Sequence, residues 1–415
     1  MSSVKDICRA AAEAAPRIAR LSAQTKNDAL HAMADALEAD AQRLVEANEV
    51  DLREARSQGT SETVVDRLAL TDKRISSMAE GLREVAAQAD PVGEVVRGWK
   101  RPNGLLIQQV RVPLGVVAVI YEARPNVTAD VAGLCLKSGN ACILRGSSIA
   151  LSSNKAIVDV LSRAGADAGM PTDAVQLVPD ASRASATELM QAKEYVDLLV
   201  PRGGAALIKS IEDNATVPYI IDGDGNCHVY VDRSADTTVA SRIVVNAKTQ
   251  RPSVCNAAET LLVHEELADK WLPQVLDELA AKGVEIRGDE TVCQTWPNAL
   301  QAEEEDWGRE YLDLILAVKV VDSLDDAIAH VNRWGTSNAE AIVTEDLTAA
   351  RRFAAEVDSG SIFVNASTRF SDGGEFGYGA EIGISTQKLH ARGPMGLTEL
   401  TTSKYVVWGE GQTRD

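Results

Sequence analysis

Apolar residues follow a helical period through the first part of the chain, from residue 3 to about residue 90. Leu30, Met33 and Leu37 fall on one face of such a helix, and alanines occupy many positions between them. Asp90-Pro-Val-Gly93 interrupts the pattern, because proline and glycine are poor helix formers. The sequence therefore predicts a helical segment that packs through its apolar face.

A change to strand-like patterning follows this helical segment. Residues 94–100 and 105–112 mix apolar and polar positions and are separated by Pro102-Asn-Gly104, which predicts a β-hairpin. The tail, residues 401–408, alternates in the way expected of an edge strand. We expect these strands to form a small arm outside the main cores.

Short apolar runs then alternate with stretches of helical period. The run 116–120 holds only apolar residues, which is typical of a strand buried on both faces. Such alternation predicts a parallel sheet covered by helices on both faces, with ligands bound beyond the carboxyl ends of its strands. The predicted strands are residues 116–120, 141–144, 175–178 and 196–200, and the predicted helices are 126–138, 152–168, 182–192 and 205–212.

The same alternation returns in the second half of the chain and predicts a second α/β unit. Its predicted strands are residues 259–263, 312–321, 339–343 and 359–365, and its predicted helices are 237–248, 265–281, 324–333 and 347–357.

We therefore predict two doubly wound α/β domains and a small β arm. The first domain comprises residues 1–226 together with about 366–395, and the hairpin at 94–113 interrupts it. The second domain comprises residues 227–365, and the arm joins the hairpin to residues 396–415.

Composition narrows the possible partners and compartment. The 415 residues carry a net charge of -19, which disfavours nucleic acids and anionic membranes as partners. Apolar runs such as 116–121 are too short to cross a bilayer, and the N-terminus lacks the apolar core of a signal peptide. Six cysteines without a Cys-x-x-Cys pair predict a reducing cytoplasm and no metal site.

One cysteine stands in a polar and basic setting that suits chemistry. Cys255 lies between a predicted helix and a predicted strand, with Lys248 and Arg251 shortly before it. Nearby cations raise the thiolate fraction of a thiol, and loops between such elements often carry catalytic groups. Local sequence alone leaves two interpretations about equal, a nucleophile and a small buried side chain.

Strand ends in the first domain offer candidates for nucleotide binding, although no Gly-x-Gly-x-x-Gly is present. Arg145 follows a predicted strand directly, where a basic residue favours the 2′-phosphate of NADP. A surface arginine beside a turn is the alternative. Gly203 and Gly204 precede a predicted helix, so their N–H groups either face a pyrophosphate or form a simple tight turn.

Several long motifs resemble one known family. Asn246-Ala-Lys, Gln250-Arg-Pro and Cys255-Asn-Ala-Ala-Glu-Thr260 resemble the nucleophile loop of the gamma-glutamyl phosphate reductases, within the aldehyde dehydrogenase superfamily. The resemblance covers nearly the whole chain. Further matching motifs, in the family's order, are Val112-Pro-Leu-Gly115, Ile120-Tyr-Glu-Ala-Arg-Pro-Asn-Val-Thr128, Leu134-Cys-Leu-Lys-Ser-Gly-Asn140, Pro201-Arg-Gly-Gly204, Gly225-Asn-Cys-His228, Gly379-Ala-Glu-Ile-Gly-Ile-Ser385 and Lys388-Leu-His-Ala-Arg-Gly-Pro-Met-Gly396.

The resemblance implies an aldehyde dehydrogenase-like fold and a role for each candidate residue. Cys255 is expected to be the nucleophile, and Asn126 is expected to stabilise the oxyanion together with the Cys255 N–H. A plain helix N-cap is the alternative for Asn126. Glu310 resembles the glutamate that holds the nicotinamide ribose, and a solvated loop acid is its alternative. We predict substrate contacts from a set of three residues, Lys248, Arg251 and Ser253.

The reaction implied is NADPH-dependent reduction of L-glutamyl 5-phosphate to L-glutamate 5-semialdehyde and phosphate in proline biosynthesis. An NAD-dependent semialdehyde dehydrogenase is the alternative, and a binding protein without activity is a third hypothesis. Hydrolytic relatives carry a water-activating glutamate near the stretch Asp222-Gly-Asp-Gly-Asn226, where this chain has only aspartates. The resemblance also implies a homo-oligomer built through the arm, and it makes glutamate 5-kinase a possible partner.

Two motifs depart from the family pattern. Ser147 and Ile149 stand where a second glycine and an acidic residue are expected after Arg145, which affects the adenosine pocket. The stretch 327–338 keeps only His330 of the family's histidines, so we do not expect catalysis there.

Overall fold

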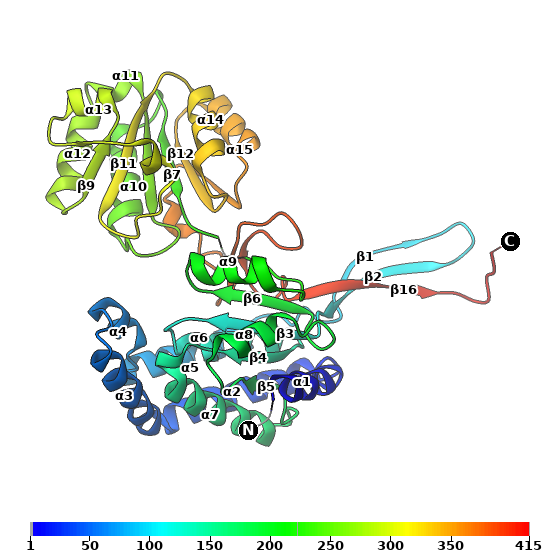
Figure 1. Cartoon of the computed structure of the whole chain (residues 1–415). Coiled ribbons are helices and arrows are strands. Elements are labelled where there is room, and N and C mark those ends of the chain that lie inside the picture. The colour runs from blue at the N-terminus through cyan, green and yellow to red at the C-terminus, as the bar shows by residue number, and fades with distance from the viewer. Residues whose placement is uncertain (1–2, 222, 415) are drawn as a thin grey trace. The chain divides into compact units, whose positions relative to one another are not determined.

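The computed structural model describes residues 3–221 and 223–414, and the chain forms two compact units (Figure 1). Each unit contains a parallel sheet with helices packed against it, which confirms the predicted α/β class. Among the described residues, the first unit comprises 3–221, 377–383 and 395–414, and the second comprises 223–376 and 384–394.

This division differs from the prediction in three segments. Residues 223–226, 366–376 and 384–394 were expected in the first domain, but they belong to the second unit. Hydrogen bonds explain the position of residues 366–376: the Thr368 hydroxyl donates to the Asn256 carbonyl at 2.7 Å, and Asn256 Nδ2 donates to the Ser371 carbonyl at 3.0 Å. The segment is therefore bound to the loop that carries Cys255.

The N-terminal helical segment is five helices rather than one. Side chains of Ser3, Ser22 and Thr71 accept backbone N–H groups where three of them begin, as N-caps do. Neither these nor any other helix of the described residues is long and apolar enough to cross a membrane. The five are α1 (Val4–Ile18), α2 (Ala23–Ala39), α3 (Ala41–Ser57), α4 (Glu62–Leu68) and α5 (Asp72–Ala87).

The sheet of the first unit has the order β5-β4-β3-β6, and all its pairings are parallel. Every residue of β3 is buried, as its composition predicts. The chain steps from β3 to β4 and β5 and then returns to β6 on the other side of β3. This places a topological switch point between β3 and β6, where sheets of this kind bind ligands. The elements are β3 (Val116–Tyr121), α6 (Asn126–Lys137), β4 (Ala141–Arg145), η1 (Ser148–Ala150), α7 (Leu151–Asp167), β5 (Val175–Leu177), α8 (Arg183–Met190), β6 (Leu198–Arg202) and α9 (Ala205–Asn214).

The second unit is built on a seven-stranded sheet with the order β10-β9-β11-β8-β7-β12-β13. Its strands and 3-10 helices are β7 (Cys227–Val231), β8 (Ala258–His264), β9 (Glu285–Gly288), β10 (Leu300–Gln301), η2 (Glu304–Gly308), β11 (Ile315–Val321), β12 (Ala339–Val343), β13 (Ser361–Val364) and η3 (Thr368–Phe370). Its α-helices are α10 (Thr237–Thr249), α11 (Glu265–Ala268), α12 (Leu272–Ala281), α13 (Glu290–Thr295), α14 (Leu324–Trp334) and α15 (Leu347–Glu356).

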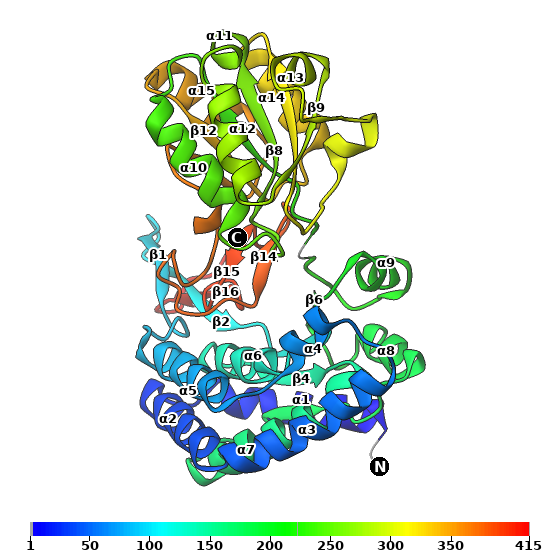
Figure 2. The same ribbon diagram turned by 90° about the vertical axis from the view of Figure 1, so that its left-hand side faces the viewer.

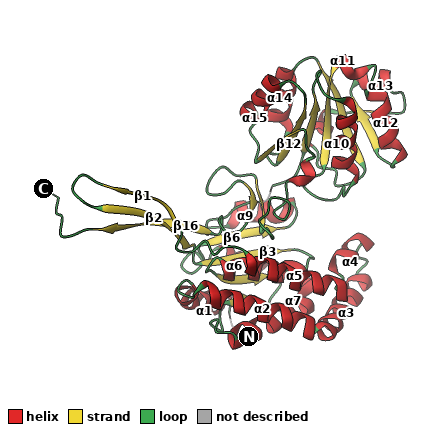
Figure 3. Ribbon diagram, turned by 180° about the vertical axis from the view of Figure 1, so that it is seen from behind, coloured by secondary structure: helices red, strands yellow, loops and turns green. Residues whose placement is uncertain are grey.

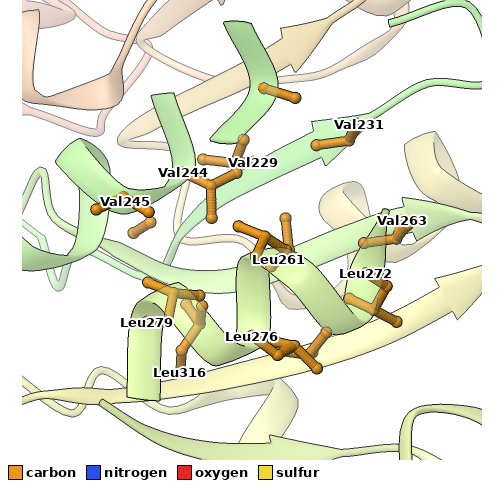
Figure 4. Packing of buried hydrophobic residues seen from close by; sticks show 14 of the residues in the cluster. Val229, Val231, Val244, Val245, Leu261, Val263, Leu272, Leu276, Leu279 and Leu316 are labelled. Atoms are coloured by element: carbon orange, nitrogen blue, oxygen red, sulfur yellow. The ribbon is translucent and has the colours of Figure 1, made fainter. Parts of the chain in front are cut away.

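Alternating side chains divide this sheet between two cores. Val229 and Val231 face α10 and α12, which lie side by side (Figure 2), while Tyr230 between them packs into a second cluster with α14 and α15. Leu261 and Val263 of β8 point to the first core in the same way (Figure 4). Since both faces are covered, the central strands β7, β8, β11 and β12 are rich in apolar residues.

The predicted hairpin and tail strand form one three-stranded antiparallel sheet, which extends away from the α/β part of the first unit (Figure 3). Its strands are β1 (Val95–Lys100), β2 (Leu106–Pro113) and β16 (Thr401–Trp408). All residues of β1 are exposed, and so are Tyr405, Val407 and Trp408 of β16. We call this sheet the arm. Two short strands, β14 (Gly383–Ser385) and β15 (Gly393–Met395), complete the elements of the described residues.

Candidate active site

Cys255 lies in a tight turn between the end of α10 and the start of β8, as predicted, and its residue is partly exposed. The next residue, Asn256, is buried, and its side-chain and carbonyl bonds to Ser371 and Thr368 hold the turn in place. A cysteine that is accessible on a fixed loop fits the nucleophile better than the buried-side-chain interpretation.

The backbone of residues 225–227 runs directly against this turn. A Cβ added at Gly225 would lie 1.7 Å from the Cys255 carbonyl oxygen, so only glycine fits there. The Cys227 thiol donates to the same carbonyl at 3.2 Å. Glu310 Oε1 accepts the Gly225 N–H at 2.8 Å, so the predicted ribose-binding glutamate lies beside the cysteine loop. Glu310 is partly exposed in a loop, so its contact with the ribose stays a prediction.

Two arginines supply positive charge near Cys255. Arg251, a predicted substrate contact, is exposed. Arg369 is half-buried, and its Nε donates to Gln250 Oε1 at 2.9 Å. Burial lowers the pKa of Arg369, and Arg251 acts in the same direction, while Cys255 is close enough to oppose both. Sequence reasoning missed Arg369, because no local pattern marks an arginine that reaches the site from a distant segment.

Lys248 does not fit its predicted contact with the substrate. Its ammonium group is fully buried and donates to Glu259 Oε2 at 2.6 Å, and Glu259 Oε1 accepts the Leu312 N–H at 3.1 Å. Burial lowers the pKa of Lys248 and raises that of Glu259, and the charge of each opposes the shift of the other. This ion pair connects the end of α10 to the start of β8, on either side of the cysteine loop.

The remaining residues predicted around Cys255 have less defined positions. Ser253 is half-buried in the turn. Asp222 lies outside the described residues, and Asp224 is exposed. Asn226 is buried, and its side-chain amide donates to the carbonyls of Trp307 and Trp334, so its role in this stretch is structural. No group of three metal-ligating side chains was found in the described parts of the chain.

In the first unit, Asn126 is the first residue of α6, just beyond the carboxyl end of β3. The turn between them is strained, because Ala123 has a φ of 22°. Asn126 Nδ2 donates to Asp130 Oδ2 at 3.1 Å, one turn along the helix. Pro125, not Asn126, is the N-cap, and Asn126 makes no capping bond, so the predicted alternative is wrong.

Asn126 and Asp130 line a cavity of about 250 Å³ within the first unit. Its walls also include Gly81 and Val127 and the residues of the segment 379–382. Its charged lining residues are Arg124, Asp130, Arg202 and Glu381.

Arg145 ends β4, and its guanidinium is already engaged. One nitrogen, Nη2, donates to the carbonyls of Ala181 and Ser182 at 2.6 and 2.9 Å. Nε is buried and has no hydrogen-bond partner among the described residues. Burial lowers the pKa of Arg145, and Asp180 opposes that shift. Arg145 is therefore partly buried, and part of its hydrogen-bonding capacity holds the loop after β5.

Gly203 and Gly204 follow β6 at the switch point. A Cβ added at Gly203 would lie 2.8 Å from the Glu122 carboxyl carbon, and the Gly204 N–H donates to Glu122 Oε2 at 3.2 Å. Glu122 follows β3, so the two strand ends meet here. Glycine is required by this close approach, and one of the two predicted pyrophosphate donors is occupied by a carboxylate.

Known proteins resemble this chain along its entire length. The aldehyde dehydrogenase family matches residues 1–295 and 307–406. Gamma-glutamyl phosphate reductase of Thermobifida fusca is 56% identical over 411 residues, covering 99% of this chain and 98% of the relative. The same enzyme of Moorella thermoacetica is 57% identical, covering 97% of each chain.

Solved structures agree with the sequence comparison. The crystal structure of gamma-glutamyl phosphate reductase from Thermotoga maritima covers 100% of both chains with a TM-score of 0.98 and 47% identity. An acetylating aldehyde dehydrogenase from Geobacillus thermoglucosidasius, at 17% identity and a TM-score of 0.70, covers 99% of this chain and 97% of its own and shares the fold. The chain therefore belongs to the aldehyde dehydrogenase family, and within it to the gamma-glutamyl phosphate reductases.

Proposed function

We propose that this chain is an oxidoreductase of proline biosynthesis that reduces L-glutamyl 5-phosphate to L-glutamate 5-semialdehyde and phosphate, using NADPH and a thioester on Cys255. The observation that carries the proposal is the cysteine loop, an accessible thiol held by Asn256 and Gly225 with two arginines near it. The relatives named as gamma-glutamyl phosphate reductases match it over nearly their full length.

The covalent step follows from the chemistry of an acyl phosphate. The Cys255 thiolate attacks the acyl carbon, the carbon–oxygen bond to phosphate breaks, and a thioester forms. Arg251 and Arg369 are the cations that we assign to the departing phosphate, in place of the buried Lys248, and Ser253 remains a proposed substrate contact. Asn126 and the Cys255 N–H are proposed as the oxyanion donors, as the family resemblance implies.

The residues at the strand ends of the first unit suit a nicotinamide cofactor. A glycine that permits close approach, a buried Arg145 Nε without a partner and a switch point between β3 and β6 are features of such sites. We propose that Arg145 and Gly203 hold the cofactor, with Glu310 at its ribose, while the Gly204 N–H is bonded to Glu122. When bound, the cofactor would supply a hydride to the thioester, and Cys255 would then release the aldehyde from the thiohemiacetal and return to the thiolate.

The alternative is an NAD-dependent dehydrogenase that hydrolyses its thioester, and it needs a carboxylate that activates water. Glu259 is fully buried with both oxygens engaged by Lys248 and Leu312, and Asn226 is structural. These positions favour the acyl phosphate.

We further propose that the arm joins copies of the chain into a homo-oligomer, since its exposed apolar side chains suit burial against another chain. We propose the cytoplasm as the compartment, on the six free cysteines. Glutamate 5-kinase, which produces the acyl phosphate, stays a possible partner.

The direct test is the reaction in reverse. Purified enzyme is mixed with L-glutamate 5-semialdehyde, phosphate and either NADP or NAD, and formation of the reduced cofactor is followed. The proposal predicts turnover with NADP that exceeds turnover with NAD. No turnover with either cofactor would reject the proposed substrate, and a preference for NAD would reject the proposed cofactor.

A further inference from the structure

The buried ion pair of Lys248 and Glu259 has no role in the proposed chemistry, yet it joins the two ends of the cysteine loop. Lys248 lies in the last turn of α10 and Glu259 is the second residue of β8, so the pair closes the loop of residues 250–257. Neither side chain is exposed, and Lys248 Nζ lies 2.6 Å from Glu259 Oε2. A contact that holds the two ends of a loop together limits the conformations open to that loop.

The second oxygen of Glu259 bonds a different segment of the chain. Glu259 Oε1 accepts the Leu312 N–H at 3.1 Å. Leu312 has a φ of 55°, which residues other than glycine rarely adopt, so the surrounding structure has to hold its backbone there. Its side chain is 41% exposed, so the bond to Glu259 restrains this residue more than packing does.

The restrained segment also carries Glu310. Glu310 Oε1 accepts the Gly225 N–H at 2.8 Å, and a Cβ added at Gly225 would lie 2.6 Å from the Cys255 Cα. Burial raises the pKa of Glu259 to about 7, and the negative charge of Glu310 adds to this shift, so the two carboxyl groups interact. These contacts all lie within the second unit. They run from the cysteine loop through Glu259 to the segment of Glu310, and back through Gly225 to the loop.

We propose that Glu259 is a positioning residue, which holds the cysteine loop and the segment of Glu310 in one fixed arrangement, with Lys248 as its charge partner. The inference rests on the proposed function, in which Cys255 attacks the substrate and Glu310 holds the cofactor ribose. Glu259 acts through the positions of these two residues. A displacement of about 1 Å can cost about 100-fold in rate, because reacting groups must meet in a defined geometry.

Two double variants separate a positioning role from a stabilising one. Lys248→Met with Glu259→Leu replaces the ion pair by apolar side chains of similar size, an exchange that often leaves a fold as stable as before. It also removes the acceptor of the Leu312 N–H. Lys248→Gln with Glu259→Gln is the matched control, because its two amides remove the same charges but can bond each other and the same N–H.

The measurements are the thermal midpoint, the kcat and the KM for NADP in the phosphate-dependent oxidation, and the Kd for NADPH by calorimetry. We expect the apolar pair to fold and its kcat to fall by about 10- to 100-fold. Its KM for NADP and its Kd for NADPH should each rise about three- to tenfold, the range of one lost hydrogen bond. A merely structural pair would leave these three values unchanged. The amide pair should stay within about threefold of the wild type in each value.

A folded apolar pair with the kcat and cofactor binding of the wild type would overturn the inference, and so would an amide pair that is impaired as strongly as the apolar pair. A fall in kcat with unchanged cofactor binding would also overturn it, because Glu259 would then serve the cysteine loop alone. If the apolar pair does not fold, Glu259→Asp takes its place with the same expected results. This variant keeps the charge beside Lys248, but it is one methylene group too short to reach Leu312 as well.

The wild-type enzyme distinguishes a failure of this inference from a failure of the proposed function. If the wild type does not oxidise L-glutamate 5-semialdehyde with NADP and phosphate, the proposed function fails and the inference fails with it. If the wild type turns over and the folded apolar pair matches it in kcat and in cofactor binding, the inference fails while the proposed function stands.

Discussion

At the scale of single residues, Cys255 is the position on which the chemistry depends. We expect Cys255→Ala to lose turnover almost completely, because no other group replaces the thioester, while cofactor binding stays close to that of the wild type. Turnover is measured by NADPH formation, and cofactor binding by calorimetry. Residual turnover above about one per cent would remove Cys255 from the role of nucleophile.

Arg145 is the residue that we assign to cofactor choice. Arg145→Glu should weaken NADPH binding by at least about tenfold more than NADH binding, because it places a negative charge near the 2′-phosphate. Arg183→Glu makes the same charge change on an exposed side chain at the start of α8 and serves as a control. Equal losses for the two cofactors in Arg145→Glu would show that the residue only holds the carbonyls of Ala181 and Ser182.

The ionised carboxylate of Asp130 should lower the stability of the fold at neutral pH. Its carboxyl has a pKa of about 6 in the folded chain, raised from 3.8, so ionisation disfavours the folded state. A carboxyl with a raised pKa stabilises the fold below its unfolded pKa, and this stabilisation is lost as the pH rises through the folded value. Asp130→Asn should therefore gain stability relative to the wild type between about pH 4 and pH 7, by about 2–3 kcal/mol.

The measurement is the difference in thermal midpoint between Asp130→Asn and wild type at several pH values. A variant that becomes relatively less stable as the pH rises would show that the ionised Asp130 carboxylate stabilises the fold.

At the scale of elements, the arm offers the clearest prediction. Tyr405 and Val407 are exposed on β16, 56% and 52% respectively, and Trp99 of β1 packs edge-on against Tyr405. Replacing both β16 residues by aspartate should lower the mass of the oligomer, because charges are costly in an apolar interface. Analytical ultracentrifugation measures the mass. The pair Tyr405→Phe and Val407→Thr is the control, and an unchanged mass in the aspartate variant would place the interface elsewhere.

The sequence predicted most elements because their signals are local. All-apolar runs such as 116–120 identified buried strands, and Pro102-Asn-Gly104 identified the hairpin. The sequence did not predict the breaks between the helices α1 to α5. Alanine-rich stretches continue across the short turns that separate these helices, so the helical pattern looks uninterrupted. The predicted boundary near residue 366 failed, because that segment joins the second unit through hydrogen bonds to Asn256 that no local pattern reveals.

The sequence indicated candidate site residues only where a single residue of a recognisable motif carries the chemistry. Cys255, Asn126 and Glu310 were selected in this way, and their roles stay predictions. Arg369 was missed, since an arginine becomes significant only through the distant residues that surround it. Lys248 was assigned wrongly to the substrate because proximity in sequence to Cys255 does not reveal that the side chain points inward to Glu259.

At the scale of the whole molecule, the central claim is that phosphate, not water, resolves the thioester on Cys255. The most direct measurement is the oxidation of L-glutamate 5-semialdehyde by NADP with and without added phosphate, together with analysis of the products. We predict that turnover requires phosphate or arsenate, and that replacing the exposed Asp224 by asparagine changes it little, since an exposed aspartate is a weak base at neutral pH. Steady formation of glutamate without phosphate would contradict the account and support the hydrolytic dehydrogenase.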